Sequence, residues 1–145
     1  MQRPAADLAK LARMALAEQE LDVGAAETAV EVVRQVTESE IWKRATASQQ
    51  QLVEVPFETC LPVEQRIDGL PTIVRGVIDL VFWERDGWVI TDYKTDRAAL
   101  DQLSELAEHY RPQVDTYAQI WSDVTGQAVR EKGLFFTAVQ RYITL

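Results

Sequence analysis

Several residue types and patterns are scarce in this sequence, and each scarcity excludes a class of protein. Cys60 is the one cysteine, so the chain has neither a disulfide framework nor a cysteine metal cage. No apolar run approaches the roughly 20 residues that a membrane-spanning helix needs. The opening segment MQRPAADLAKLARM carries charges where a secretory signal peptide would need an unbroken apolar stretch. We therefore expect a cytoplasmic protein with no membrane contact.

Positive charge is also scarce, since 15 Lys and Arg face 23 Asp and Glu and give a net charge of −8. Non-specific binding to nucleic acid depends on Lys and Arg pairing with phosphates, so a free-standing DNA-binding protein of this charge is not expected. An enzyme that acts on nucleic acid stays compatible with it, because bound metal ions neutralise acidic groups. A domain tethered to a larger DNA-binding protein also needs little positive charge of its own.

The spacing of apolar residues predicts helices over residues 5–47, with a break at Asp22-Val23-Gly24. The second of these helices has no Gly or Pro inside it and is expected to continue to Trp42. Strands are predicted over 52–58, 73–84 and 88–93. The last two read as a hairpin closed by the turn Arg85-Asp86-Gly87.

The remainder of the chain predicts one interrupted helix and two closing strands. The side chain of Thr95 or Asp96 is expected to cap the helix. Pro112 is expected to mark a break or the start of a new helix. The helical pattern ends near Gly126, and strands are predicted over 132–139 and 142–145. The order of elements indicates an α+β or mixed α/β domain around a central sheet.

Three charged residues interrupt the predicted hairpin. Asp79 lies within an apolar strand, Asp92 lies at the end of the partner strand, and Lys94 follows two residues later. The alternation of a strand points Asp92 and Lys94 to one face, and a tight hairpin can bring Asp79 close to Asp92. Two neighbouring carboxylates repel each other, and a proton or a divalent cation relieves that repulsion.

Such a group suits hydrolysis of a phosphodiester bond. Carboxylate oxygens are hard ligands that favour Mg²⁺ or Mn²⁺, which activates water and offsets charge on the phosphate. Lys94 could orient or deprotonate the attacking water, or hold the charge of the transition state. The simpler alternative is an ion pair at a strand edge without catalysis, although a carboxylate in a buried strand is costly without a partner.

The segments that carry these residues resemble a known family. Asp79 in GVIDLVF, Asp92 and Lys94 in ITDYKTD, and Gln113 and Tyr117 in HYRPQVDTYA together resemble the PD-(D/E)xK nuclease superfamily. The similarity is greatest to its RecB-like branch, the nuclease domain of AddA- and RecB-type (UvrD-like) helicase–nuclease subunits. It covers roughly residues 27–145, including the upstream segments ESEIWKRA and LVEVPF. The resemblance implies a restriction-endonuclease-like fold, with a mixed central sheet flanked by helices and an N-terminal helical segment.

The resemblance also implies a role for each matched position. Asp79, Asp92 and the backbone carbonyl of Tyr93 would bind Mg²⁺ or Mn²⁺, and Lys94 would be the catalytic lysine. Gln113 and Tyr117 would face the active site and help to position DNA. Tyr110 shares their helix face, because the three are spaced i, i+3 and i+7. Glu54 is a weaker candidate, since family members often hold an acidic residue before the Pro-Phe pair.

One feature departs from the family pattern. Its members usually carry a metal-binding His on a helix near the start of the domain, whereas the one His here is His109, far downstream. We therefore expect a fragment of a larger helicase–nuclease, with an N-terminal helical segment 1–50 and a nuclease core 51–145 in the same domain. The metal site of this fragment would lack one ligand, so the isolated fragment could be inactive. A natural protein that lacks this His, and could be inactive, is the competing explanation.

The implied partners follow from that family. They are DNA, the helicase domains of the parent protein and a second, AddB- or RecC-like subunit, in the processing of double-strand DNA ends. The sequence has no Walker-type phosphate loop, so ATP would be used by the parent's helicase region alone. An excised domain would expose apolar surface and could dimerise. The alternatives are a phosphodiesterase with another substrate, and a non-catalytic module of the same fold that guides DNA or serves as a subunit-contact surface.

Overall fold

A computed structural model describes residues 5–97 and 99–145, which form two compact units. The first unit ends at Trp42 and the second runs from Lys43 to Leu145. The first is a helix hairpin of α1 (Ala5–Glu18) and α2 (Ala26–Glu38), joined through a 3-10 turn, η1 (Val23–Ala25). Asp22 caps that turn by accepting a hydrogen bond from the Gly24 N–H at 2.8 Å, so the predicted break is confirmed.

The helix that was expected to continue to Trp42 ends earlier. α2 stops at Glu38, Ser39 has an extended ψ of 154°, and α3 (Glu40–Ala47) begins directly after it. The Ser39 hydroxyl donates to the Val36 carbonyl at 2.6 Å and accepts from the Trp42 N–H at 3.3 Å. Local bonds of this kind compete with the helical pattern, which is why a serine ends a run that contains neither Gly nor Pro.

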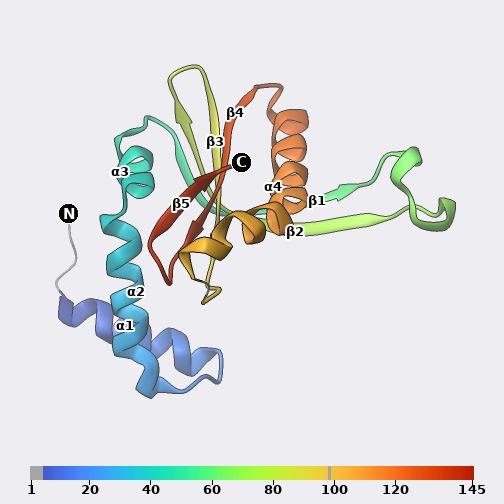
Figure 1. The fold of residues 1–145 in the computed structure, drawn as a ribbon. Helices are drawn as coiled ribbons and strands as arrows, with labels where there is room; N and C mark the ends of the chain where they lie inside the picture. The colour runs from blue at the N-terminus through green and yellow to red at the C-terminus, as the bar shows by residue number, and fades with distance from the viewer. Residues whose placement is uncertain (1–4, 98) are drawn as a thin grey trace. The chain divides into compact units, whose positions relative to one another are not determined.

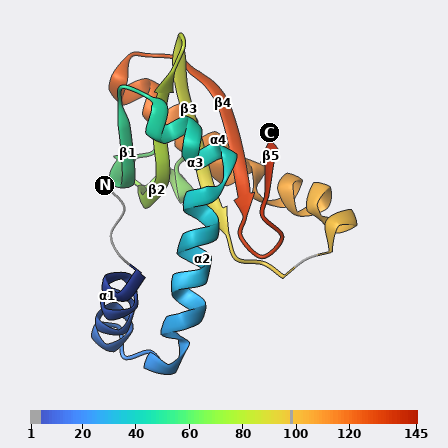
Figure 2. The same ribbon diagram turned by 90° about the vertical axis from the view of Figure 1, so that its left-hand side faces the viewer.

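The second unit is built on a five-stranded sheet with the order β1-β2-β3-β4-β5 (Figure 2). β3 and β4 are parallel and the other neighbours are antiparallel. The strands are β1 (Gln51–Cys60), β2 (Ile73–Glu84), β3 (Gly87–Lys94), β4 (Val129–Phe136) and β5 (Arg141–Thr144). The parallel pair needs a crossover, and α4 (Leu103–Thr125) supplies it. The predicted mixed α/β class is therefore confirmed.

The hairpin of β2 and β3 is the strand pair that the sequence predicted best. Its turn places Arg85 at φ 57°, and its register runs from Glu84 opposite Gly87 to Leu80 opposite Thr91. β1 pairs with β2 well beyond that point, to Cys60 opposite Ile73. Residues 55–78 therefore form a two-stranded extension, here called the arm, which projects away from the other strands in Figure 1.

Two sequence predictions around α4 were wrong. Neither Thr95 nor Asp96 caps the helix, because a 3-10 turn, η4 (Leu100–Gln102), precedes α4. Ala99 is the N-cap residue of that turn and Gln102 is that of α4. Pro112 does not break the helix either, since α4 is continuous over 23 residues. The end predicted near Gly126 is confirmed, because Gly126 takes a left-handed φ of 67° there.

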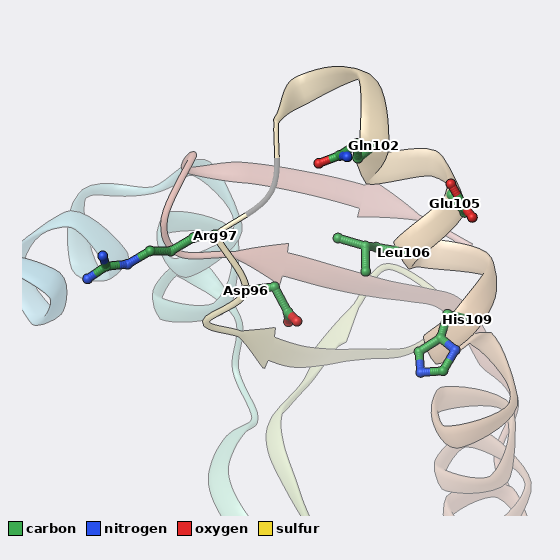
Figure 3. Close-up of a pocket in the computed structure, with 6 residues that line it drawn as sticks. All are labelled: Asp96, Arg97, Gln102, Glu105, Leu106 and His109. Carbon is green, nitrogen blue, oxygen red and sulfur yellow. The ribbon is translucent and has the colours of Figure 1, made fainter.

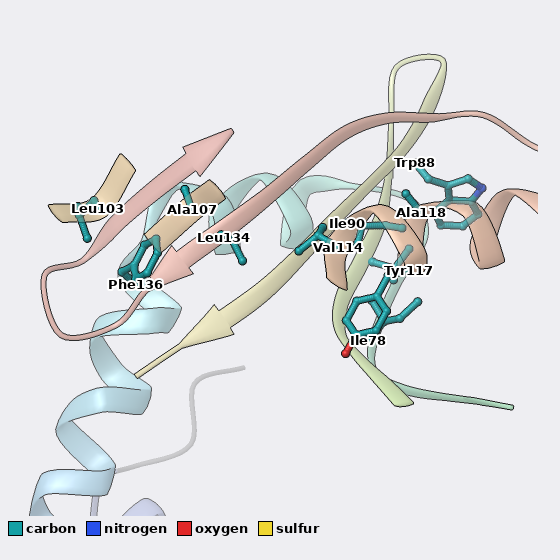
Figure 4. Close-up of a cluster of buried hydrophobic side chains, with 11 residues drawn as sticks. Ile78, Trp88, Ile90, Leu103, Ala107, Val114, Tyr117, Ala118, Leu134 and Phe136 are labelled. Atoms are coloured by element: carbon teal, nitrogen blue, oxygen red, sulfur yellow. The ribbon is translucent and has the colours of Figure 1, made fainter. Parts of the chain in front are cut away.

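α4 covers one face of the sheet and forms the core of the second unit with it. The cluster in Figure 4 joins apolar side chains of α4 to inward-facing residues of β2, β3 and β4. Its members include Val81, Ile90, Leu134, Phe136, Leu103, Ala107, Val114 and Tyr117, all buried. In the described residues no helix has both the length and the apolar character to cross a membrane.

Candidate active site

The three charged residues singled out in the sequence lie together where the β2–β3 ladder ends. Leu80 opposite Thr91 is the last pair of that ladder, so Asp79 and Asp92 occupy the next pair of positions. Lys94 shares the face of Asp92, because side chains two residues apart in a strand point the same way. This is also the face that α4 covers, since Asp92 and Lys94 lie beside the core residues Leu134 and Phe136 of β4.

Asp79 is a carboxylate held in an unfavourable environment. Burial raises its pKa above the ordinary range, and the negative charges of Asp92 and Glu54 raise it further. Its Oδ2 accepts a hydrogen bond from the Tyr93 N–H at 2.7 Å, and this bond and the Lys94 charge act in the opposite direction. The pKa of Asp79 is raised overall, so a cation bound at this position would relieve the repulsion between the carboxylates.

The Lys94 ammonium is fixed by three contacts. Its Nζ lies 2.7 Å from Oδ2 of Asp92, donates to Oε1 of Gln113 at 2.8 Å and lies 4.0 Å from the ring centroid of Tyr110. Gln113 in turn donates from Nε2 to the Tyr117 hydroxyl at 2.6 Å. The side chain of Lys94 is only 13% exposed. The expected common helix face of Tyr110, Gln113 and Tyr117 is therefore the face that meets Lys94.

Two supporting residues had no role in the sequence predictions. Phe57 of the arm packs against Tyr117 edge to face, with ring centroids 5.4 Å apart. Gly76 leaves the space for that ring, since a Cβ there would lie 2.6 Å from Cζ of Phe57. The signal was present, because Phe57 stands in LVEVPF and Gly76 opens GVIDLVF.

A third residue, Asp96, was given no functional role in the sequence predictions, because it was assigned to a helix cap. The Tyr110 hydroxyl donates to its two carboxylate oxygens at 3.1 and 3.2 Å. Asp96 also lines a hollow of about 520 Å³ between the segment after β3 and the start of α4 (Figure 3). The other residues that line it are Arg97, Gln102, Glu105, Leu106 and His109.

Glu54 and His109 lie at the margin of this site. Glu54 is exposed on β1 between the residues that pair with Leu80 and Ile78, and it takes a left-handed φ of 51°. Its charge contributes to the raised pKa of Asp79. His109 is an exposed residue of α4 whose ring lies 5.0 Å from that of Tyr110.

The donor set fits a hard divalent cation. The side chains that could bind a cation here are the two carboxylates of Asp79 and Asp92. Among the described residues there is no group of three or more His, Cys, Asp and Glu side chains that could hold a metal ion. The Tyr93 carbonyl can join them, because N–H and C=O of a strand residue point to the same side and this N–H meets Asp79. Mg²⁺ commonly uses one or two carboxylates and keeps several waters, so this set suits Mg²⁺ or Mn²⁺.

Comparison with known proteins identifies the family of this chain. A family model described as the PD-(D/E)XK nuclease superfamily matches residues 2–144. The relatives include three proteins that are each named as the A-type subunit of an ATP-dependent helicase/nuclease. That of Heliobacterium modesticaldum is 34% identical over 125 residues, which is 79% of this chain and 9% of that protein. That of Carboxydothermus hydrogenoformans is 42% identical over 71 residues, or 49% of this chain and 6% of that protein.

The corresponding protein from Acetivibrio thermocellus is 32% identical over 111 residues, which is 71% of this chain and 9% of that protein. The chain thus spans less than a tenth of the length of these curated relatives. The family match, in contrast, extends over almost all of this chain and includes every residue of the site. The chain belongs to the PD-(D/E)XK nuclease superfamily.

Proposed function

We propose that this chain is a metal-dependent DNA nuclease domain that hydrolyses phosphodiester bonds. The observation that carries the proposal is the meeting of Asp79, Asp92 and Lys94 on one face, where β2 and β3 separate. A buried and a half-buried carboxylate beside a half-buried ammonium are costly for a fold, and such groups concentrate at functional sites. The membership of the nuclease superfamily supports the same reaction class.

Asp79, Asp92 and the Tyr93 carbonyl would hold Mg²⁺ or Mn²⁺. Such an ion, when bound, supplies positive charge that makes the attacking water more acidic and offsets the charge on the phosphate. The bond from the Tyr93 N–H fixes Oδ2 of Asp79, so that carboxylate is already oriented before an ion arrives. Asp92 is only 4% exposed and is held by Lys94, which limits its freedom in the same way.

Lys94 would stabilise charge rather than accept a proton. Its ion pair with Asp92 needs the ammonium form, which has no lone pair, and its bond to Gln113 is likewise one that it donates. An ammonium placed beside the metal ligands can orient the attacking water and hold the negative charge that builds on the phosphorus oxygens. Of the two roles that the sequence left open, the contacts therefore favour charge stabilisation.

Gln113 and Tyr117 would keep this constellation in place and contact the DNA backbone. Gln113 accepts a hydrogen bond from Lys94 and donates one to the Tyr117 hydroxyl, so Tyr117 orients Gln113 and Gln113 orients the ammonium. Tyr117 is 8% exposed, and this burial favours a supporting role over base stacking. Tyr110, with its ring against Lys94, belongs to the same support.

The larger context follows from the relatives. Because they are named as helicase/nuclease subunits and are far longer than this chain, we propose that the domain acts beside an ATP-dependent helicase and cuts strands fed to it. Processing of double-strand DNA ends by an exonuclease, a cytoplasmic location and a second, AddB- or RecC-like subunit belong to this proposal. Homodimerisation of the chain alone stays a prediction.

A non-catalytic module is the second candidate, and one observation favours it. The described residues contribute two carboxylates and no histidine to the site, and His109 is an exposed residue whose ring lies 5.0 Å from that of Tyr110. A module of this kind would bind DNA or a partner in EDTA as well as in Mg²⁺, and it would never cleave.

The decisive experiment combines metal binding with cleavage. Calorimetry with Mn²⁺ on the 145-residue chain should show binding that is absent in Asp79→Asn. In Mg²⁺ the chain should degrade linear DNA and leave a single-stranded circle intact if it is an exonuclease. Lys94→Ala should lower kcat by about 10²- to 10³-fold, as removal of one charge-stabilising group does.

Lys132→Ala is the matched control for Lys94→Ala. Lys132 also extends from a strand to α4 and pairs with a carboxylate there, Asp115, but it lies outside the site. Its loss should leave cleavage unchanged. A wild-type chain that neither binds Mn²⁺ nor cuts DNA would refute the nuclease proposal and leave the non-catalytic module.

A further inference from the structure

The carboxylate of Asp96 has no part in the proposed metal site, yet it touches the support of Lys94. Its oxygens lie 3.1 and 3.2 Å from the Tyr110 hydroxyl, and the Tyr110 ring lies 4.0 Å from Nζ of Lys94. We propose that Asp96 is a positioning residue, which orients the Tyr110 ring and through it the Lys94 ammonium. The inference rests on the proposed nuclease function, because Lys94 is the group that is positioned.

Asp96 reaches Lys94 only indirectly, so its role is to position the ammonium and not to contact it. Among the described residues no hydrogen bond or ion pair joins Asp96 to Lys94, so its effect must pass through the ring of Tyr110. Both carboxylate oxygens lie at nearly the same distance from the hydroxyl, so the tyrosine is directed between them. The bond is long for a hydroxyl donor, but it is shared between two oxygens and restrains the ring at its far end.

Asp96 has this bond to Tyr110 and also borders the hollow after β3. The hollow of about 520 Å³ is lined by Asp96 itself and by Leu106 and His109, which are neighbours of Tyr110 on α4 (Figure 3). Asp96 thus joins the segment after β3 to α4 through the Tyr110 hydroxyl, and a ring without this bond loses its tether at the hydroxyl end.

Lys94 is sensitive to the position of the Tyr110 ring because its side chain is long and flexible. Its ammonium has three partners in the structure, the Asp92 carboxylate, the Gln113 amide oxygen and the face of the Tyr110 ring. The attraction between a cation and a ring face is directional and is strongest where water is excluded. When the ring moves, Lys94 keeps two partners and gains freedom to leave the reacting geometry, and a displacement of 1 Å can cost about 100-fold in rate.

The first test observes Lys94 directly and needs no catalysis. The chain has four lysines, so a proton–carbon spectrum of the ¹³C-lysine-labelled protein in EDTA is simple, and Lys94→Arg identifies the Lys94 signals. The ring face should shift the Lys94 ε-methylene protons upfield, and Tyr110→Leu should abolish that shift. Asp96→Ala and Tyr110→Phe break the same hydrogen bond, so each should reduce the shift, and the double variant should reduce it no further.

Two control variants separate positioning from a general structural effect. Asp96→Asn keeps an oxygen acceptor for the Tyr110 hydroxyl, so the Lys94 shift should return to near the wild-type value. Asp101→Ala removes an exposed carboxylate from the same connection and should change nothing. An unmoved Lys94 signal in Asp96→Ala, or an equal movement in Asp101→Ala, would overturn the inference whatever the cleavage assay shows.

The second test measures cleavage in Mg²⁺. Asp96→Ala and Tyr110→Phe should each lower kcat by about tenfold with little change in KM, because the substrate contacts remain and only the reacting geometry loosens. Asp96→Asn should recover most of the loss. If the Lys94 signal responds as expected but the wild-type chain cuts no DNA, the positioning contact stands and the proposed nuclease function fails.

Discussion

The Asp79→Asn substitution should make the metal-free chain more stable while it removes metal binding. Asp79 accepts the Tyr93 N–H bond through one oxygen, and an asparagine can keep that bond through its own carbonyl oxygen. The substitution removes the negative charge and changes the volume of the side chain very little. The site therefore offers a direct test of whether stability has been given up for function.

The expected gain follows from the groups around the carboxylate. Its charge is opposed by burial, by Asp92 and by Glu54, and it is favoured by the Tyr93 bond and by Lys94. The favourable and unfavourable contributions partly cancel, so we expect a net gain of about 1 kcal/mol, within the range of single stabilising substitutions. That corresponds to roughly a fivefold change in the unfolding equilibrium.

The pH dependence has a definite sign. Because the pKa of Asp79 is raised in the folded chain, the folded state holds this proton more readily than the unfolded state. The stability that the protonated group contributes is complete below the unfolded pKa of about 4 and is lost as the pH rises through the folded pKa. The advantage of Asp79→Asn should thus be full near neutral pH and should disappear as the pH falls toward about 4.

Urea unfolding followed by tryptophan fluorescence measures this difference. Three of the four tryptophans, Trp83, Trp88 and Trp121, lie in the second unit and report on it. Mg²⁺ at about 100 times its Kd should stabilise the wild type by about 2.7 kcal/mol and leave the variant unchanged, so the order of stability reverses. A variant that is less stable in EDTA, or an advantage that persists near pH 4, would refute this reasoning.

Two further substitutions test the supports of the second unit. Gly76→Ala should destabilise the chain by about 1–3 kcal/mol in urea, because its Cβ would lie 2.6 Å from the Phe57 ring; unchanged stability would contradict that close contact. Arg44→Met should cost about 2 kcal/mol at neutral pH, because Glu84 and Glu131 lose the guanidinium hydrogen bonds that lower their pKa. Since both pKa values are depressed, this contribution is present above the unfolded value of 4.5 and is lost as the pH falls through the folded values, so an equal cost near pH 3 would count against it.

The sequence predicted the strands more reliably than the ends of the helices. The hairpin of β2 and β3 was predicted well because a β-branched and aromatic run meets an unambiguous turn at Arg85 and Gly87. The break at Ser39 was missed because it comes from side-chain bonds rather than from Gly or Pro. Pro112 was misjudged because a proline inside a helix is tolerated when the carbonyl that it leaves without a partner stays in water.

The sequence predicted the parts of the candidate site that depend on residue spacing within strands and helices. It did not predict the parts that depend on contacts between residues distant in the chain. Strand alternation and the hairpin register place Asp79, Asp92 and Lys94 together, and helical spacing gives α4 its site-facing side. The roles of Phe57 and Asp96 depend on pairs distant in the chain, and no periodicity brings such pairs to notice. Their catalytic importance, like that of the three charged residues, stays a prediction.

The continuity of α4 through Pro112 is what allows both tyrosines to serve Lys94. Residues seven apart in an α-helix point within roughly 20° of each other, so Tyr110 and Tyr117 face Lys94 together only if the helix is unbroken between them. Pro112 lies two residues after Tyr110, a rotation of about 200°, and is exposed on the side away from the site. The backbone bond that it removes would have gone to the carbonyl of Glu108, an exposed residue, where water can take its place. The helix can therefore accept its proline on the solvent side without losing the alignment that holds the ammonium.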